Sequence, residues 1–344
     1  MNNMINEKIK NSTVDEIHKI LINTKKITIT THVNPDGDAI GSELAFFFYC
    51  QQKGIETRII NCSETPYNLM FLAGIENVNV YTDNDNEYIM KSDAVFVLDL
   101  NNSPRIKAME NVVLQSNALK IVIDHHIEPS FDADFYHIDS ASASTGELIW
   151  KILKCDEQLK ITEEIASALY TAIMTDTGSF RFPQTTRETH LIIAELIKYG
   201  ADPVKIYEEV YNIIPYRAAL LQGEAFASSE LFYDGKLVVM TLTKEIFKKT
   251  GGLDSDIEGI VEHTVTIKGV QAGVLITERP NDPEVRISFR SKGDINVREL
   301  AVELGGGGHF HAAGARLSNV TFSDAKKIII EKAGKLFIQQ IFFP

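Results

Sequence analysis

Hydrophobic positions in the first half of the chain follow two alternating patterns, short continuous runs and longer runs with helical spacing. Runs of β-branched and other apolar residues predict strands at residues 26–32, 57–62, 93–100 and 120–126. Residues 39–54 predict a buried helix that ends at Gly54. Continuous apolar strands that alternate with helices are typical of a parallel sheet covered on both faces. We therefore predict a doubly wound α/β domain, whose ligands gather at the carboxyl ends of the strands.

The pattern changes after a mostly helical stretch at residues 185–225. Breaks at Gly200, Pro203 and Pro215 suit a connection between domains. Beyond it, the spacing predicts strands at 236–243, 270–279 and 284–292, a short helix at 294–304 with Asp294 as its N-cap, and a last helix from about Asp324. We predict a catalytic domain at 1–195, a helical linker at 196–225, and a smaller C-terminal α+β domain at 226–344, with the active site in the cleft.

Charge is unevenly distributed along the chain, whose 344 residues suit two domains. Residues 1–225 hold 19 basic and 32 acidic residues, which gives the whole net charge of −13, whereas residues 226–344 hold 15 of each. Proteins that grip long nucleic acid usually show a basic stripe, so we expect no long nucleic acid as a partner. A polyanion could approach the acidic half only beside bound cations, although an acidic surface that merely aids solubility explains the charge equally well.

Membrane and export signals are missing from the pattern. No stretch approaches the ~20 apolar residues that a membrane span needs, and the first 26 residues are too polar for a signal peptide. Cys50, Cys62 and Cys155 are scattered without metal-ligand spacing, which favours reduced thiols. We therefore expect a cytoplasmic protein without a membrane partner.

Potential metal ligands follow three of the four predicted strands. They are His32, Asp36 and Asp38 after the first, Asp99 at the end of the third, and Asp124, His125 and His126 at the end of the fourth, and Asp176 follows a predicted helix. Each has an ordinary explanation alone, such as a turn, a helix cap or a surface histidine. Together, five carboxylates at one sheet edge would repel one another unless cations were bound. Mixed Asp and His ligands suit divalent ions such as Mn²⁺, and paired metals serve phosphoryl displacement.

A family resemblance rests on five motifs that span nearly the whole chain. "HVNPDGDAIGS", "VLDLN", "VIDHH" and "TDTGSF" resemble the four motifs of the DHH phosphoesterase superfamily, and "GGGGHFHAAG" resembles the signature of its companion DHHA1 domain. The chain is most similar to the small bacterial two-domain enzymes that act as oligoribonuclease and 3′-phosphoadenosine-5′-phosphate (PAP) phosphatase. Relatives of these enzymes cleave cyclic dinucleotides or the linear dinucleotides derived from them.

The resemblance implies a role for each motif residue. It places one metal on His32 and Asp36 and a second on Asp38, His125 and Asp176, with Asp99 bridging both. His126 would face the substrate phosphate, and Asp124 would orient a histidine ring. Gly37 would permit a tight turn that lets Asp36 and Asp38 point at different ions.

Candidate substrate-binding residues lie mainly in the second domain. Gly306, Gly307 and Gly308 can expose backbone N–H groups as an anion-binding nest beside His309, although four glycines alone also suit a tight backbone crossing. In "VRISFRS", Arg286, Ser288 and Arg290 share one strand face, and Arg290 and Ser288 could hold a phosphate or base. A solvated strand face is the alternative. Arg181 and Arg105 are weaker candidates, for which a surface role stays open.

Short oligoribonucleotides or PAP are the expected substrates, hydrolysed by a two-metal hydroxide mechanism with two divalent ions, most suitably Mn²⁺, with Mg²⁺ or Co²⁺ as alternatives. A homodimer is possible by the resemblance. A cyclic-dinucleotide or linear dinucleotide phosphodiesterase is the first alternative. An inorganic polyphosphate phosphohydrolase is the second, although related pyrophosphatases lack "GGGGH". A non-enzymatic nucleotide-sensing protein is the third, and the presence of every motif acid speaks against it.

Overall fold

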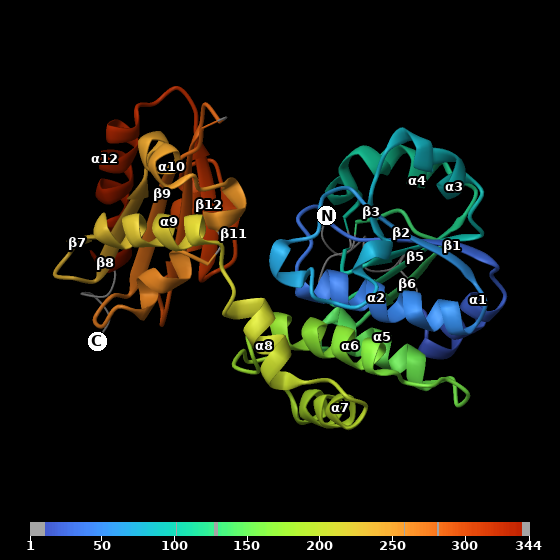
Figure 1. Ribbon diagram of the computed structural model, residues 1–344. Coiled ribbons are helices and arrows are strands. Elements are labelled where there is room, and N and C mark those ends of the chain that lie inside the picture. The colour runs from blue at the N-terminus through green and yellow to red at the C-terminus, as the bar shows by residue number, and fades with distance from the viewer. Residues whose placement is uncertain (1–10, 101, 127–129, 258, 281, 339–344) are drawn as a thin grey trace. The chain divides into compact units, whose positions relative to one another are not determined.

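The chain forms two compact units, residues 1–213 and 214–344, in a computed structural model that describes residues 11–100, 102–126, 130–257, 259–280 and 282–338 (Figure 1). The boundary between the units falls inside the stretch 196–225 that the sequence indicates as a linker. Helix α8 (Pro203–Tyr211) belongs to the first unit, and α9 (Tyr216–Ala227) to the second.

A six-stranded parallel sheet with the order β3-β2-β1-β4-β5-β6 organises the first unit. Its strands are β1 (Lys26–Thr30), β2 (Glu56–Asn61), β3 (Val78–Val80), β4 (Ala94–Leu98), β5 (Leu119–Asp124) and β6 (Phe135–Ile138). The four predicted strands are confirmed, and the short edge strands β3 and β6 were missed. The order reverses between β1 and β4, which in a doubly wound sheet is the point where ligands bind.

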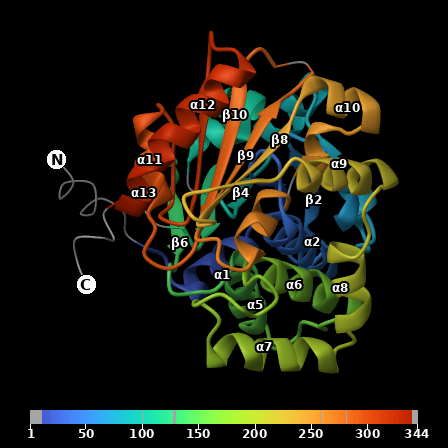
Figure 2. The ribbon, with the colours of Figure 1, turned by 90° about the vertical axis from the view of Figure 1, so that its left-hand side faces the viewer.

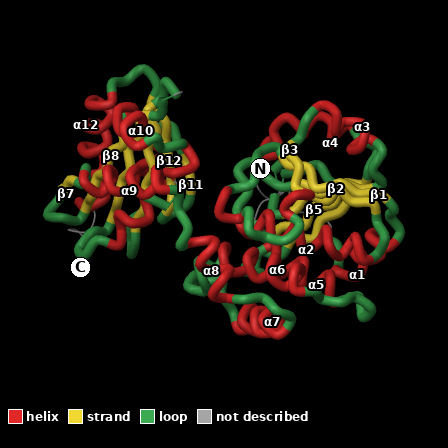
Figure 3. Tube along the Cα trace, viewed as in Figure 1, coloured by secondary structure: helices red, strands yellow, loops and turns green. Residues whose placement is uncertain are grey.

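Helices cover both faces of this sheet (Figure 3). They are α1 (Val14–Ile22), α2 (Gly37–Gln52), α3 (Asn86–Met90), α4 (Glu110–Gln115), α5 (Thr145–Lys154), α6 (Glu163–Asp176) and α7 (Arg187–Lys198), in addition to α8. One core joins α2, α5 and α6 to strand residues such as Ile29 and Phe96, and the other joins α3 and α4 to Val95 and Val97. The doubly wound α/β architecture is therefore confirmed.

Helices α2 and α6 touch so closely that two positions on α2 admit no side chain. A Cβ at Gly37 would lie 2.5 Å from the Thr175 side chain, and one at Gly41 would lie 2.3 Å from the carbonyl oxygen of Ala168. Gly37 is the first helical residue, so close packing against α6 explains it, and the predicted role in a tight turn is wrong. This approach brings the start of α2 next to the end of α6, where Asp38 and Asp176 lie.

The second unit is built on a mixed sheet with the order β11-β12-β10-β9-β8-β7. Its strands are β7 (Glu230–Phe232), β8 (Leu237–Leu242), β9 (Ala272–Glu278), β10 (Val285–Ser291), β11 (Gly307–Gly308) and β12 (Ala312–Leu317), and its helices besides α9 are α10 (Lys244–Thr250), α11 (Val297–Glu303), α12 (Phe322–Ala333) and α13 (Lys335–Ile338). Helices α11 and α12 pack on one face, and α9 and α10 on the other (Figure 2). The predicted α+β domain is confirmed.

The start of α11 corrects one prediction. Asn296, not Asp294, is the N-cap, because its side chain accepts a hydrogen bond of 3.1 Å from the backbone N–H of Arg298. Both residues are good capping types, so the sequence pattern alone did not separate them.

No helix in the described part of the chain is long and apolar enough to cross a bilayer. Cys50, Cys62 and Cys155 are free thiols.

Candidate metal centre and substrate surface

The predicted metal ligands meet at the carboxyl edge of the parallel sheet, around the reversal between β1 and β4. Three overlapping groups have ligand atoms within 4.8 Å of one another: His32, Asp36 and Asp99; Asp38, His125 and Asp176; and Asp99, His125 and His126. The first two groups coincide with the ligand sets that the family resemblance implies. Asp99 lies between them, since His32 and His125 both approach its carboxylate.

The loop after β1 fixes His32 and Asp36. Nδ1 of His32 lies 3.0 Å from the carbonyl oxygen of Val33, so Nδ1 carries the proton and Nε2 faces Asp99 at 3.3 Å. Asp36 caps α2, because its Oδ1 accepts a hydrogen bond of 3.1 Å from the N–H of Ala39. Asp36 is thus a helix cap that also belongs to the cluster. The ordinary explanation as a cap and the functional one as a metal ligand are therefore compatible.

Asp38 is held by the N-terminus of α5. Its two oxygens accept hydrogen bonds from the backbone N–H groups of Thr145 at 2.7 Å and Gly146 at 2.8 Å. Unpaired N–H groups and the helix dipole both favour an anion at this position. The side chain is only 1% exposed. Helix α5 therefore fixes the position of one predicted ligand of the second metal.

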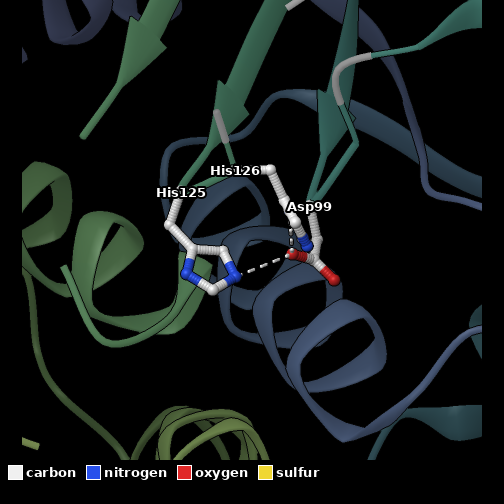
Figure 4. Close-up of side chains that lie close together, drawn as sticks. All are labelled: Asp99, His125 and His126. Carbon is white, nitrogen blue, oxygen red and sulfur yellow. Dashed lines mark ion pairs between the residues drawn. The ribbon is translucent and has the colours of Figure 1, made fainter. Parts of the chain in front are cut away.

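Asp99 occupies the centre of the cluster in a backbone conformation that few residues adopt. Its φ is +56°, and its N–H continues the sheet by donating to the carbonyl oxygen of Ile123 at 3.0 Å. Oδ1 accepts a hydrogen bond of 3.0 Å from the hydroxyl of Thr145 and lies 3.6 Å from Nε2 of His125 and 3.7 Å from Nδ1 of His126 (Figure 4). Left-handed backbone at a non-glycine residue stores strain and concentrates at functional sites.

The two adjacent histidines after β5 have different partners. Nε2 of His125 lies 3.3 Å from Oδ2 of Asp176 and 3.8 Å from Oδ2 of Asp38, whereas Nδ1 of His126 lies 2.7 Å from Oδ1 of Asp124. Asp124 is fully buried, and the His126 side chain is 46% exposed. The hydrogen bond to Asp124 raises the pKa of His126 to about 9, so its ring is a cation at neutral pH.

Charge at this edge is not balanced by the protein itself. Burial and the neighbouring acids, led by Asp99, raise the pKa of Asp38 well above its usual range, and burial raises that of Asp176 to about 6. Burial also acts to raise the pKa of Asp99, but His32 and the other histidines outweigh it and lower the pKa. Within the described residues, Nε2 of His125 and Oδ2 of Asp176 have no hydrogen-bond partner. Oxygen and imidazole donors in this state fit divalent metal ions.

Two supports of the cluster were missed in the sequence. Thr145 donates its backbone N–H to Asp38 and its hydroxyl to Asp99, and no sequence pattern indicated which acids it holds. The fully buried Glu43 on α2 accepts a hydrogen bond of 2.8 Å from the Asn61 side chain, whose Oδ1 accepts one of 3.2 Å from the N–H of Thr31 beside His32. No sequence signal joined Glu43 to Asn61, because they meet only through packing.

Ser288, Arg290 and Gly307 share one face of the second unit's sheet, whereas Gly308 pairs with Ala313 on the other face. Ser288 pairs with Gly314 across β10 and β12, and Gly314 pairs with Gly307 across β12 and β11. Directly paired residues point to the same face, so two glycines leave a strip without side chains beside Ser288. Arg290 pairs with Ala312, two residue pairs further along the same two strands. The turn from His309 to Ala312 is closed by a hydrogen bond of 2.7 Å from the N–H of His309 to the carbonyl oxygen of Ala312. Strand β10 alternates buried and half-buried residues, as the period-two pattern predicts.

Close packing requires glycine on both sides of Gly307, although a Cβ at Gly307 itself would meet nothing within 4 Å. A Cβ at Gly306 would lie 2.0 Å from the carbonyl oxygen of Gly314, and one at Gly308, whose φ is +138°, would lie 2.5 Å from that of Ala312. The tight backbone crossing considered for "GGGG" is therefore present. His309 is exposed at its end.

The four candidate arginines differ in whether an acid already holds them. Arg290 donates to Glu262 at 2.6 Å, and Arg286 to Asp282 at 2.6 Å. Arg181 uses Nε to donate to the carbonyl oxygen of Gly178 at 2.6 Å, and among the described residues no carboxylate lies within 4.0 Å of its guanidinium. Arg105 contributes its carbonyl oxygen, which accepts from the N–H of Val33 at 2.9 Å, next to His32.

This fold and this set of ligands define a two-unit phosphoesterase. The family model described as "DHH family, N-terminal domain" matches residues 26–173, and the one described as "DHHA1 domain" matches residues 234–339. The chain belongs to the DHH phosphoesterase family, whose members hydrolyse phosphoester bonds, and the resemblance found in the sequence is confirmed.

Two named relatives and one crystal structure align with most of this chain. The chain is 31% identical to the probable bifunctional oligoribonuclease and PAP phosphatase NrnA of Streptococcus mutans, over 84% of this chain and 88% of that protein. It is 26% identical to the cyclic-di-AMP phosphodiesterase PdeA of Listeria monocytogenes, over 91% of this chain but 48% of the relative. A crystal structure of an exopolyphosphatase-related protein from Bacteroides fragilis superposes with a TM-score of 0.87 at 30% identity, over 94% of this chain and 96% of that chain.

Proposed function

We propose that this protein hydrolyses short oligoribonucleotides to nucleoside monophosphates and converts PAP to AMP and phosphate. The observation that carries the proposal is the meeting of His32, Asp36, Asp38, Asp99, His125 and Asp176 in two sets of ligands that share one edge of the sheet. The relative from Streptococcus mutans, which aligns with most of the chain and is named for both activities, supports the choice of substrates.

His32, Asp36 and Asp99 would hold one divalent ion, and Asp38, Asp99, His125 and Asp176 the other. Mn²⁺ suits this mixture of imidazole and carboxylate ligands, and Mg²⁺ or Co²⁺ are the alternatives. When bound, such ions lower the pKa of water and neutralise phosphate charge. Burial and neighbouring acids raise the pKa values of Asp38 and Asp176, and bound cations would favour the charged forms of these carboxylates, which agrees with the proposal.

His126 would act on the substrate phosphate rather than on a metal. Because Nδ1 donates to Asp124, Nε2 is the nitrogen left to donate to a non-bridging phosphate oxygen. A cationic ring aimed at developing negative charge stabilises a transition state. Asp124 would fix the ring and its charge, while Thr145 holds Asp99 and Asp38 in place.

The second unit would bind the rest of the substrate. The strip formed by Gly307 and Gly314 beside Ser288 would receive sugar or phosphate, with His309 and Arg290 at its margin. Arg290 would have to exchange Glu262 for a phosphate, because the two are paired at 2.6 Å. We retain the division of the chain at 1–195, 196–225 and 226–344 as part of this proposal.

A substrate panel tests the proposal. Di- to pentaribonucleotides, PAP, linear pApA, cyclic-di-AMP and inorganic polyphosphate are incubated with Mn²⁺ and with a chelator, and products are separated by chromatography. Release of monophosphates and of AMP only in the presence of metal supports it. Turnover of cyclic-di-AMP alone would favour the activity in the name of the Listeria relative, turnover of polyphosphate alone would favour the second alternative, and tight binding without turnover would identify a sensor.

The role of the second unit has its own test. His309→Ala and Arg290→Ala should reduce cleavage of dinucleotides far more than cleavage of bis(p-nitrophenyl) phosphate, which has no nucleoside to bind. The matched control is Arg316→Ala, which removes an exposed arginine from the neighbouring strand β12. Equal losses on both substrates would contradict a binding role.

A further inference from the structure

The loop that follows Asp176 adopts an unusual backbone conformation. Gly178, Ser179 and Phe180 all have positive φ values, of +55°, +59° and +65°. Such a run is costly for residues with a side chain, and it persists only where surrounding contacts determine it. The N–H of Phe180 donates to the Thr177 hydroxyl at 3.1 Å, and the Phe180 ring packs edge-on against Tyr170 with centroids 6.0 Å apart. The backbone N–H groups of Arg181 and Phe182 both donate to the carbonyl oxygen of Thr177, the residue after Asp176, so the turn folds Arg181 back toward the end of α6.

The same turn leaves an arginine with free donors. The backbone N–H of Arg181 donates to the carbonyl oxygen of Thr177 at 2.9 Å, and its Nε donates to that of Gly178 at 2.6 Å. These bonds fix the side chain near its base. No acid among the described residues pairs with it, so its terminal nitrogens are available for an anionic ligand such as phosphate.

Three aromatic side chains near this loop are unusually exposed. Phe182 is 47% exposed, Tyr207 43% and Tyr211 41%. Tyr207 and Tyr211 are one turn apart on α8, and their ring centroids lie 5.1 Å apart. The Phe182 ring covers Gly178, where a Cβ would approach it to 2.5 Å. Aromatic rings gathered on a surface, rather than scattered singly, indicate a binding site.

The phenol of Tyr211 lies close to the loop that follows Asp176. Burial raises the pKa of Tyr211, the Ser179 hydroxyl and Arg181 act against that shift, and Tyr207 and the charge of Asp176 add to it. The phenol therefore lies beside Ser179 in the strained loop. A nucleotide whose phosphate reaches Arg181 and the metal cluster would bring its base to these rings.

We propose that Tyr211, together with Tyr207 and Phe182, forms a stacking surface for the nucleobase of the nucleotide whose phosphate lies at the metal cluster, with Arg181 holding a phosphate oxygen. Tyr211, Tyr207, Phe182 and the adjoining Arg181 are together called the aromatic surface. The inference rests on the proposed function, because it takes a nucleotide as the substrate. Stacking on an aromatic ring tolerates every base, which suits an enzyme that degrades oligoribonucleotides of any sequence.

Base-free substrates test this assignment. Three dinucleotides are compared by kcat/KM: one with both bases, and two in which 1-deoxyribose replaces either the first or the second nucleoside. The variants are Tyr211→Leu, which keeps an apolar side chain without a ring, and Tyr211→Phe, which keeps the ring. Tyr81→Leu is the matched control, since Tyr81 follows the edge strand β3 in the same unit.

We expect the wild-type enzyme to favour the complete dinucleotide over one base-free analogue by about 5- to 150-fold, the range measured for stacking of one base. Tyr211→Leu should remove that preference by slowing turnover of the complete dinucleotide far more than turnover of the same analogue, while Tyr211→Phe and Tyr81→Leu should retain it. An undiminished preference in Tyr211→Leu would overturn the assignment, as would equal losses on all three substrates, which would show that Tyr211 supports the fold.

A binding measurement separates this inference from the proposed function. Calorimetry compares AMP with ribose 5-phosphate on the wild-type protein and on Tyr211→Leu. If wild-type protein cleaves no oligonucleotide, the proposed function fails, yet a preference for AMP that disappears in Tyr211→Leu would still support the aromatic surface. If dinucleotides are cleaved but the variant keeps both the kinetic and the binding preference for a base, only the aromatic surface is refuted.

Discussion

Nδ1 of His126 lies 2.7 Å from Oδ1 of Asp124, while its neighbour His125 turns Nε2 toward Asp176 at 3.3 Å. Two consecutive histidines thus have different partners, one an acid fully buried behind it and the other an acid of the metal cluster. This difference agrees with the proposal that His126 acts on the substrate and His125 on a metal ion.

Replacement of the two histidines should therefore have different effects. His126→Ala should keep both metal ions yet lose about 10²–10³ in kcat, the scale of one lost transition-state donor. His125→Ala should lose metal first, since it removes one nitrogen from the second set of ligands. Metal content by mass spectrometry, measured alongside kcat, distinguishes the two. If both variants lose metal to the same extent, the division between them is wrong.

Asp124→Asn should change the pH dependence of the enzyme. The hydrogen bond to Asp124 raises the pKa of His126 to about 9, and a neutral amide cannot stabilise the imidazolium in the same way. The protonated ring is lost as pH rises through its pKa, so the alkaline limb of kcat/KM should move to lower pH in the variant. A profile measured from pH 6 to 10 shows the shift. A reduced rate with an unmoved limb would contradict a role for His126 as a cationic donor.

Asp99→Ala should be the most damaging substitution of a metal ligand. Asp99 belongs to two of the three groups of ligand atoms and lies between His32 and His125, so its loss should lower occupancy of both metal positions and abolish turnover. Asp36→Ala is the comparison, because Asp36 occurs in one group only and should affect one ion. Two bound metal ions per chain in Asp99→Ala, with normal activity, would refute the bridging role.

Glu43→Gln should make folding less sensitive to pH. Burial raises the pKa of Glu43 from 4.5 to about 8, so the folded protein keeps a proton that the unfolded chain has released. The free energy of unfolding of the wild type should therefore fall as pH rises from about 4.5 to about 8, by up to roughly 3 kcal/mol between pH 5.5 and 8.5 from this residue. The neutral glutamine escapes this loss. Urea unfolding of both proteins with a chelator measures the difference, and a constant difference between the two pH values would argue against a protonated Glu43.

Substrate length should be limited by charge. The first 225 residues carry the whole net charge of −13 and the remainder is neutral, so we expect few clustered cations to meet phosphates beyond the binding residues. Long strands gain affinity by releasing counterions to such clusters. We expect a preference for about two to five nucleotides with shallow salt dependence. The test is kcat/KM for strands of two to about twenty-four nucleotides at two salt concentrations. Efficiency that rises with length and falls steeply with salt would indicate a basic track across the fold.

The sequence by itself indicated the two-unit α/β plan and the candidate metal ligands. The strands that carry the ligands are continuous apolar runs, and local hydrophobic pattern is the signal that sequence shows most directly. The ligands follow from the same pattern, because parallel strands end at a shared edge. Residues His32, Asp99 and His125 could be expected together once β1, β4 and β5 were expected as neighbours.

Only the tertiary structure decided which groups hold those ligands in place. Thr145 and Asp99 are 46 positions apart, and Glu43 and Asn61 are 18 apart. Tyr211 and Ser179, in the loop after Asp176, are 32 apart. The short strands β3 and β6 and the packing reason for Gly37 were likewise hidden. Such contacts depend on the distance between elements, and that distance is set by side-chain packing across the core, which no local pattern records.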